Sequence, residues 1–102
     1  MTKKPRQLFL AGVKRLLLDL GAEQHDDDFV LKTKVGRLTL SPSADQPVGL
    51  GTVLTRFDDP HAARRLVDCD RISGRWNHHY SDAWAVETAI DNLSVWLGKV
   101  LA

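Results

Sequence analysis

The chain has 102 residues, of which 43% are hydrophobic and 26% charged, and its formal net charge is +1. These values are those of an ordinary globular protein and exclude a disordered chain, and the length predicts one domain spanning residues 1–102. A single cysteine, Cys69, excludes an intramolecular disulfide. No apolar run reaches the roughly 18 residues that suggest a membrane span, and Lys14 and Arg15 interrupt the first such run, so we expect a cytoplasmic protein without a signal peptide or membrane contact.

The N-terminal segment predicts a frayed end followed by an amphipathic helix. Residues 1–6 are expected to be frayed, because chain ends are poorly ordered unless something ties them down. Residues 7–20 carry apolar side chains at spacings of three and four, which is typical of a helix with one buried face: Phe9, Val13, Leu16, Leu17 and Leu20. Gly21 is a natural residue for the end of this helix.

The middle of the chain predicts three antiparallel strands. Residues 29–35 alternate between the two sides of a strand, and Gly36 marks a tight turn into a returning strand that includes Leu40. Residues 41–47 have the composition of a loop, and residues 48–57 predict a third strand.

Two helices complete the predicted fold. Asp59 suits an N-cap and Pro60 suits the first helical position, so a short helix is expected to begin there. Residues 82–101 show apolar side chains at helical spacing and predict the longest element. Because the strands need a cover for their apolar face, the sequence predicts an α+β two-layer domain, in which helices cover a three-stranded antiparallel meander in the order α-β-β-β-α-α.

An unusual stretch, SGRWNHHY, lies between these helices and is expected to form a loop at residues 73–80. A large ring buries much apolar area, so we expect Trp76 to fold inward and to act as a structural anchor together with Trp84 and Trp96. The polar neighbours are expected at the surface, with at least one of the two adjacent histidines exposed. Arginine and tyrosine are frequent interface hot spots, which makes this stretch the candidate partner-binding surface: Arg71, Arg75, Asn77, His78, His79 and Tyr80. A secondary basic patch is expected on the first hairpin at Lys32, Lys34 and Arg37.

The histidines and the cysteine between residues 61 and 79 raise two other possibilities, metal binding and catalysis. His61, Cys69, His78 and His79 are ligand types that suit zinc, but their spacing lacks the close pairs of recognisable zinc motifs. A cysteine nucleophile needs a histidine base within hydrogen-bond reach, and proximity in sequence is weak support for that. No phosphate-binding glycine loop or other catalytic signature occurs. We therefore expect no catalytic residue, no metal and no cofactor.

The C-terminal half resembles small uncharacterised proteins of phages and mobile elements, on the strength of TRFDDPHAARRL followed by SGRWNHHY and a final helix. Those proteins share an RFDDP helix start and an SG[KR]WNxH loop. The resemblance brings no established activity, but it implies a bacterial host as the setting. The leading hypothesis is a non-catalytic binding protein that engages a host protein or protein–nucleic-acid complex, as anti-CRISPR inhibitors do. The alternatives are a module for single-stranded nucleic acid, which cations and stacking rings would hold, and a small hydrolase or nuclease.

Overall fold

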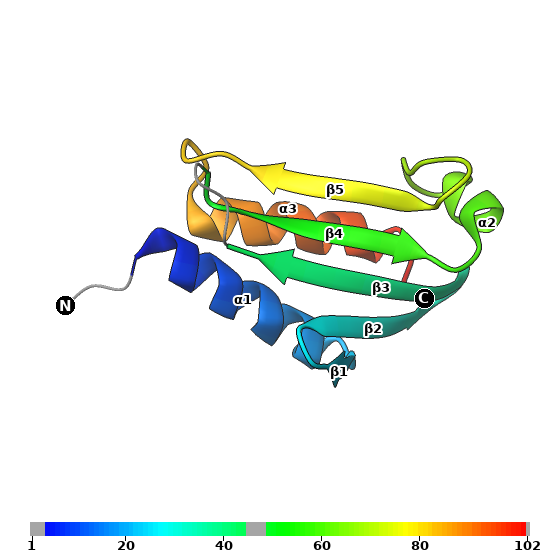
Figure 1. The fold of residues 1–102 in the computed structure, drawn as a ribbon, viewed down its shortest axis with the longest axis horizontal. Coiled ribbons are helices and arrows are strands. Elements are labelled where there is room, and N and C mark those ends of the chain that lie inside the picture. Colours follow the sequence, from blue (N-terminus) through cyan, green and yellow to red (C-terminus); the bar gives the residue numbers. More distant parts are fainter. Residues whose placement is uncertain (1–3, 45–48, 102) are drawn as a thin grey trace.

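The computed structural model describes residues 4–44 and 49–101, which form one antiparallel sheet with helices packed on it (Figure 1). The fold is α+β, and five strands lie in the sheet in the order β1-β2-β3-β4-β5. The elements in chain order are α1 (Pro5–Asp19), β1 (Glu23–His25), β2 (Asp28–Thr33), β3 (Gly36–Ser43), β4 (Gly51–Phe57), α2 (Pro60–Arg64), β5 (Arg75–Tyr80) and α3 (Val86–Gly98).

The predicted three-stranded meander is present, but it is only part of a larger sheet. The three expected strands correspond to β2, β3 and β4, and each pairs antiparallel with the next. The expectation of a three-stranded sheet is wrong, because β1 is added at one edge and β5 at the other. The segment expected as a loop after Leu40 continues β3 as far as Ser43, while residues 45–47 lie outside the described part of the chain.

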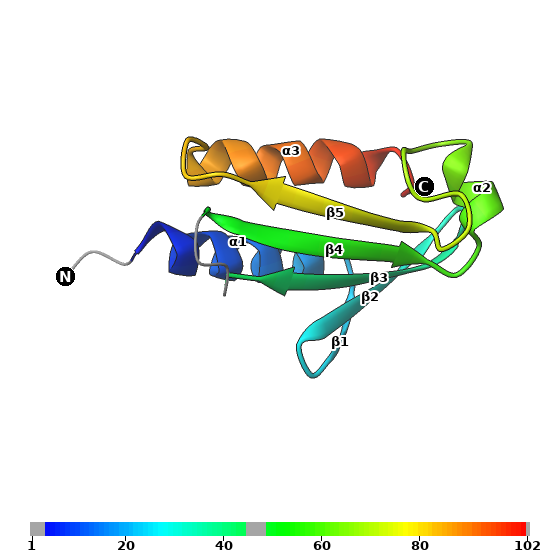
Figure 2. The ribbon, with the colours of Figure 1, turned by 45° about the horizontal axis from the view of Figure 1, so that its top comes forward.

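Helices α1 and α3 lie side by side on one face of the sheet, as Figures 1 and 2 show. Helix α1 buries Phe9, Val13 and Leu17 of the predicted stripe, whereas Leu16 is only partly buried and the C-cap Leu20 is exposed. The helix already begins at Pro5 rather than after a frayed segment through residue 6. Residues 1–3 lie outside the described residues. The two helices approach closely at Gly12, where the Ile90 side chain leaves no room for a Cβ.

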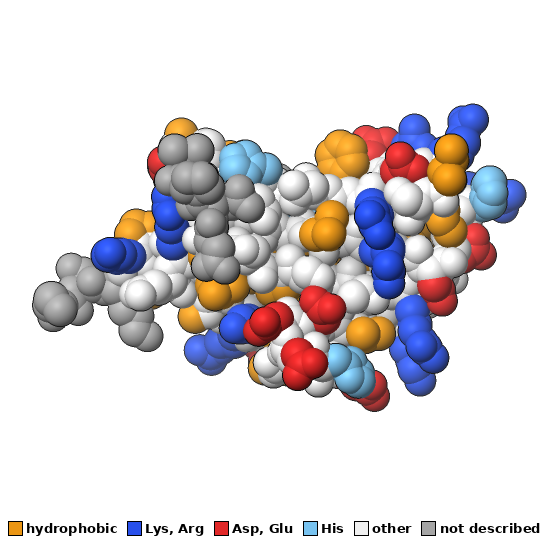
Figure 3. All heavy atoms as spheres, in the orientation of Figure 1, with side chains coloured by type: hydrophobic (Ala, Val, Ile, Leu, Met, Phe, Trp, Pro, Cys, Tyr) orange, Lys and Arg blue, Asp and Glu red, His pale blue; other side chains and the backbone are white. Residues whose placement is uncertain are grey.

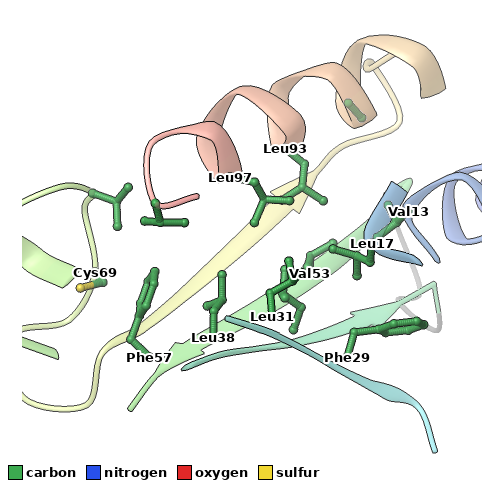
Figure 4. Packing of buried hydrophobic residues seen from close by; sticks show 14 of the residues in the cluster. Val13, Leu17, Phe29, Leu31, Leu38, Val53, Phe57, Cys69, Leu93 and Leu97 are labelled. Carbon is green, nitrogen blue, oxygen red and sulfur yellow. The ribbon is translucent and has the colours of Figure 1, made fainter. Parts of the chain in front are cut away.

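The core lies between these helices and the sheet (Figure 4). Strand residues alternate in burial along β2 to β4, as the period of two in a half-buried sheet requires. The fully buried apolar side chains include Phe9, Val13, Leu17, Phe29, Leu38, Leu40, Val53, Leu93 and Leu97. The opposite face of the sheet carries neither α1 nor α3, and we call it the open face.

The short helix α2 begins as predicted. Asp59 is its N-cap, and Asp59 Oδ1 accepts a hydrogen bond of 3.1 Å from the Ala62 N–H. The final helix begins at Val86, four residues later than expected, because residues 81–84 form a turn closed by the Trp84 N–H and the Ser81 carbonyl. Among the described residues no helix is both long enough and apolar enough to cross a membrane.

Candidate binding surface

The stretch RWNHHY is the edge strand β5, not the loop that the sequence analysis predicted. It pairs antiparallel with β4 over its whole length, from Arg56 opposite Arg75 to Gly51 opposite Tyr80. Successive side chains of a strand point to opposite faces. Arg75, Asn77 and His79 therefore lie on the open face, and the other three residues of β5 lie on the helix side.

Tyr80 and His78 belong to the core. Tyr80 is only 3% exposed, its ring packs against Phe9 at 5.5 Å, and its hydroxyl donates a hydrogen bond of 3.3 Å to Asn92 Oδ1. Burial raises the pKa of Tyr80 to about 12. The expected surface position of Tyr80 is wrong, because a residue on the helix side of the sheet is covered by α1 and α3. His79 is exposed while His78 is buried, so the expectation that one of these histidines is exposed is confirmed.

His78 carries a buried polar atom with no hydrogen-bond partner. Its ring lies edge-on to Trp96 at 4.5 Å, and Nε2 has no partner among the described residues. Burial lowers the pKa of His78 to about 4, because a charged imidazole would lose its hydration there. The side chain is therefore neutral at physiological pH, and it contributes no charge to a binding surface.

The three tryptophans differ from one another in burial. Trp96 packs against Phe57 at 5.8 Å and against His78, as expected of an anchor. Trp76 is 43% exposed at the sheet edge, so the expectation that it is a core plug is wrong. Trp84 precedes α3 instead of lying within it, and its partly exposed ring packs edge-on against Tyr80 at 5.4 Å.

Four cations form a band across the open face, which we call the basic stripe: Lys32, Arg37, Arg56 and Arg75. Lys32 lies directly opposite Arg37 in the β2–β3 register, and Arg56 lies directly opposite Arg75 in the β4–β5 register. Thr39 is the β3 partner of Arg56, which makes Arg37 a diagonal neighbour of Arg56. All four cations are exposed, and no ion pair is formed by any of them within the described residues. Figure 3 shows Lys and Arg side chains gathered on this face toward the end of the sheet where α2 lies.

The remaining predicted cations lie on turns beside the stripe. Lys34 lies on the β2–β3 turn, where its N–H donates to the Val100 carbonyl at 3.0 Å. Arg71 lies on the turn before β5, which Asp70 organises by accepting the N–H groups of Ile72 and Ser73 at 2.8 Å each. These backbone donors lower the pKa of Asp70. The predicted binding residues are thus divided among the open face, the core and two turns.

Polar and apolar side chains surround the stripe on the open face. Leu54 lies between Ser41 and Asn77 in the cross-strand register and is 41% exposed. A hollow of about 630 Å³ borders Lys32 and Arg37, and a smaller one of about 210 Å³ borders Leu54 and the two arginines of β4 and β5. The first hollow also borders Glu23 and the second also borders Asp28, so the surface combines cations with an exposed leucine and two carboxylates.

Sequence reasoning missed Arg56 and Leu54. The signal was present, because both residues alternate in the segment VLTRF with the buried Val53, Thr55 and Phe57. Their position in the stripe depends on β5, since only pairing with that strand brings Arg56 next to Arg75 and Leu54 next to Asn77.

The zinc-ligand candidates do not assemble into a site. No group of three or more His, Cys, Asp or Glu side chains suited to a metal ion occurs within residues 4–44 and 49–101. Cys69 is buried, and this burial raises the pKa of its thiol, which disfavours the reactive thiolate.

No family model, curated protein or solved structure matches the chain.

Proposed function

We propose that the protein is a non-catalytic binding protein whose open face engages an acidic surface of a host macromolecular complex. The basic stripe is the observation that carries the proposal. Like charges directly opposite each other on a sheet are destabilising, and here two such pairs stand side by side. An arrangement that costs stability in the free protein is accounted for if an anionic partner neutralises it on binding.

The surroundings of the stripe favour a protein partner over single-stranded nucleic acid. Nucleic-acid modules of that kind stack bases on aromatic rings, but Trp76, His78 and Tyr80 all lie on the helix side of β5. His79 is the only ring that β5 contributes to the open face. An exposed apolar residue such as Leu54, bordered by arginines and polar groups, has the composition of a protein interface. The resemblance to phage and mobile-element proteins is the reason for proposing a host complex, in the manner of an anti-defence inhibitor.

The double substitution Arg56→Gln/Arg75→Gln tests this function. Removing two interfacial cations is expected to weaken partner binding at least tenfold, or about 1.4 kcal/mol. Stability should be unchanged or slightly higher, because a like-charge pair is removed. The measurement is affinity capture from a bacterial lysate treated with nuclease, followed by titration of the captured protein at two salt concentrations.

A matched control is Arg15→Gln/Lys99→Gln, which removes the same charge from exposed positions on the helix layer. This control should bind like the unmodified protein. Equal binding by Arg56→Gln/Arg75→Gln would contradict the proposal. If nuclease treatment abolishes capture, and if a single-stranded oligonucleotide binds with a steep salt dependence, nucleic acid is the ligand instead.

A further inference from the structure

The two edges of the sheet are built differently. Strand β1 has three residues and leads into the run Asp26 to Asp28, which gives a short edge with many charges. Strand β5 has six residues, none of them acidic or proline, and no strand of the described residues pairs with its outer side. Natural proteins protect sheet edges by shortness, charge, bulges or proline. The β1 edge has two of these protections, and β5 between Trp76 and Tyr80 has none.

The backbone of β5 presents free hydrogen-bonding groups at that edge. Gly74 and Tyr80 accept hydrogen bonds from the β4 side, namely from the Phe57 and Leu50 N–H groups. Backbone N–H and C=O groups alternate in direction along a strand. Those of the even-numbered residues of β5 therefore point toward β4, and those of the odd-numbered residues point away from the sheet. The outward Arg75 carbonyl is occupied by the Asp70 N–H at 2.9 Å. The outward groups of Asn77 and His79 have no backbone partner among the described residues.

We infer that β5 pairs with β5 of a second copy of this chain, antiparallel and with His78 opposite His78 of the second copy. In this register the outward backbone N–H and C=O groups of Asn77 bond those of His79 of the second copy. A two-fold axis makes the same bonds between His79 and Asn77 of the second copy. It also places Trp76 opposite Tyr80 of the second copy. The inference is independent of the partner proposed for the open face.

Side-chain chemistry supports a second copy as the occupant. The segment from Trp76 to Tyr80 contains no Asp, Glu, Lys or Arg, so two copies of it can meet without repulsion between such side chains. The partly exposed ring of Trp76 gains an aromatic neighbour across the pair, and such cross-strand pairs stabilise sheets.

A register centred on Asn77 is disfavoured. It would set His79 of the second copy opposite Arg75, whose outward carbonyl already accepts the Asp70 N–H. The turn from Asp70 to Gly74 lies at that end of the edge and limits how far a second strand can extend.

Sedimentation over a concentration series, with three variants, tests the inference. The unmodified protein is expected to reach twice the 11.4 kDa of one chain. Asn77→Pro removes an outward N–H and leaves the bonds to β4 in place, so dimerisation should weaken at least about tenfold. Asn77→Ala keeps that N–H and should dimerise like the unmodified protein, and circular dichroism checks that both variants fold.

Cysteine cross-linking tests the register and does not depend on a proline variant that folds. In a Cys69→Ser background, His78→Cys is expected to form an intermolecular disulfide under mild oxidation, because directly opposite residues without mutual hydrogen bonds have Cα atoms about 4.5 Å apart. Asn77→Cys should not cross-link, because it lies opposite His79 of the second copy. A monomer at all concentrations, a dimer that persists in folded Asn77→Pro, or cross-linking of Asn77→Cys in place of His78→Cys would each overturn the inference.

Discussion

The free energy of unfolding is expected to fall as the pH is lowered from about 6.5 toward about 4, because His78 is buried in its neutral form. Its pKa in the folded protein is about 4, below the ordinary value of 6.5, so the unfolded chain binds the proton first. Stability is then fully present above pH 6.5 and is lost as the pH falls toward 4. The loss attributable to this one group is at most about 3 kcal/mol, measured by urea denaturation across that range.

His78→Phe is the matched variant for this pH dependence. Phenylalanine keeps an aromatic ring against Trp96 but cannot be protonated, and it removes the unpartnered Nε2. The variant should be at least as stable as the unmodified protein at neutral pH and should lose less stability between pH 6.5 and 4. Backbone N–H groups of Ser73 and Ile72 lower the pKa of Asp70 from 3.8, so the stability that this carboxyl contributes is lost mainly as the pH falls below this window. An identical pH profile in both proteins would refute the assignment to His78.

Phe9→Ala is expected to lower the free energy of unfolding by about 3 to 5 kcal/mol, as for other large aromatic residues removed from a core. The Phe9 side chain is fully buried, and it contacts the Tyr80 ring of β5. Its ring also fills the space beside Gly51 of β4, where an added Cβ would lie 2.6 Å from a ring carbon of Phe9. The substitution thus opens a cavity where α1 meets the two last strands of the sheet. Chemical denaturation at pH 7 gives the value directly.

The neighbouring substitution Leu8→Ala serves as the control for Phe9→Ala. Leu8 lies on the same helix but is 44% exposed, and substitutions at exposed positions usually change stability by less than about 0.5 kcal/mol. Comparable losses for the two variants would mean that α1 does not bury the face that its spacing predicts.

The elements that the sequence predicts correctly are those whose hydrophobic pattern is complete. Helix α1 has an uninterrupted apolar stripe, and β2 to β4 alternate clearly. Strand β1 has the sequence EQH, and all three of its residues are exposed, so it pairs with β2 without any apolar pattern of its own. Pattern reading cannot detect a strand of this kind.

The error at β5 came from giving residue type more weight than spacing. Asparagine and a preceding serine–glycine pair favour a loop, yet Trp76, His78 and Tyr80 recur with the period of a strand. Residue type identified the region of interest but not which side chains face outward. For the same reason the basic stripe is only partly predictable from the sequence: the sequence names Arg75 as a candidate, while its neighbour Arg56 cannot be placed without the register of β4 and β5.

The three-residue strand β1 determines how far the sheet can grow. If two copies join through β5, each free edge of the combined sheet is a β1 strand beside the acidic run at Asp26. Head-to-tail pairing of β1 with β5 would generate an open-ended filament, whereas pairing of like edges about a two-fold axis closes after two copies. In such a dimer, a short and charged β1 edge would prevent further strand pairing. The β5 edge could then pair with a second copy without leading to filament growth.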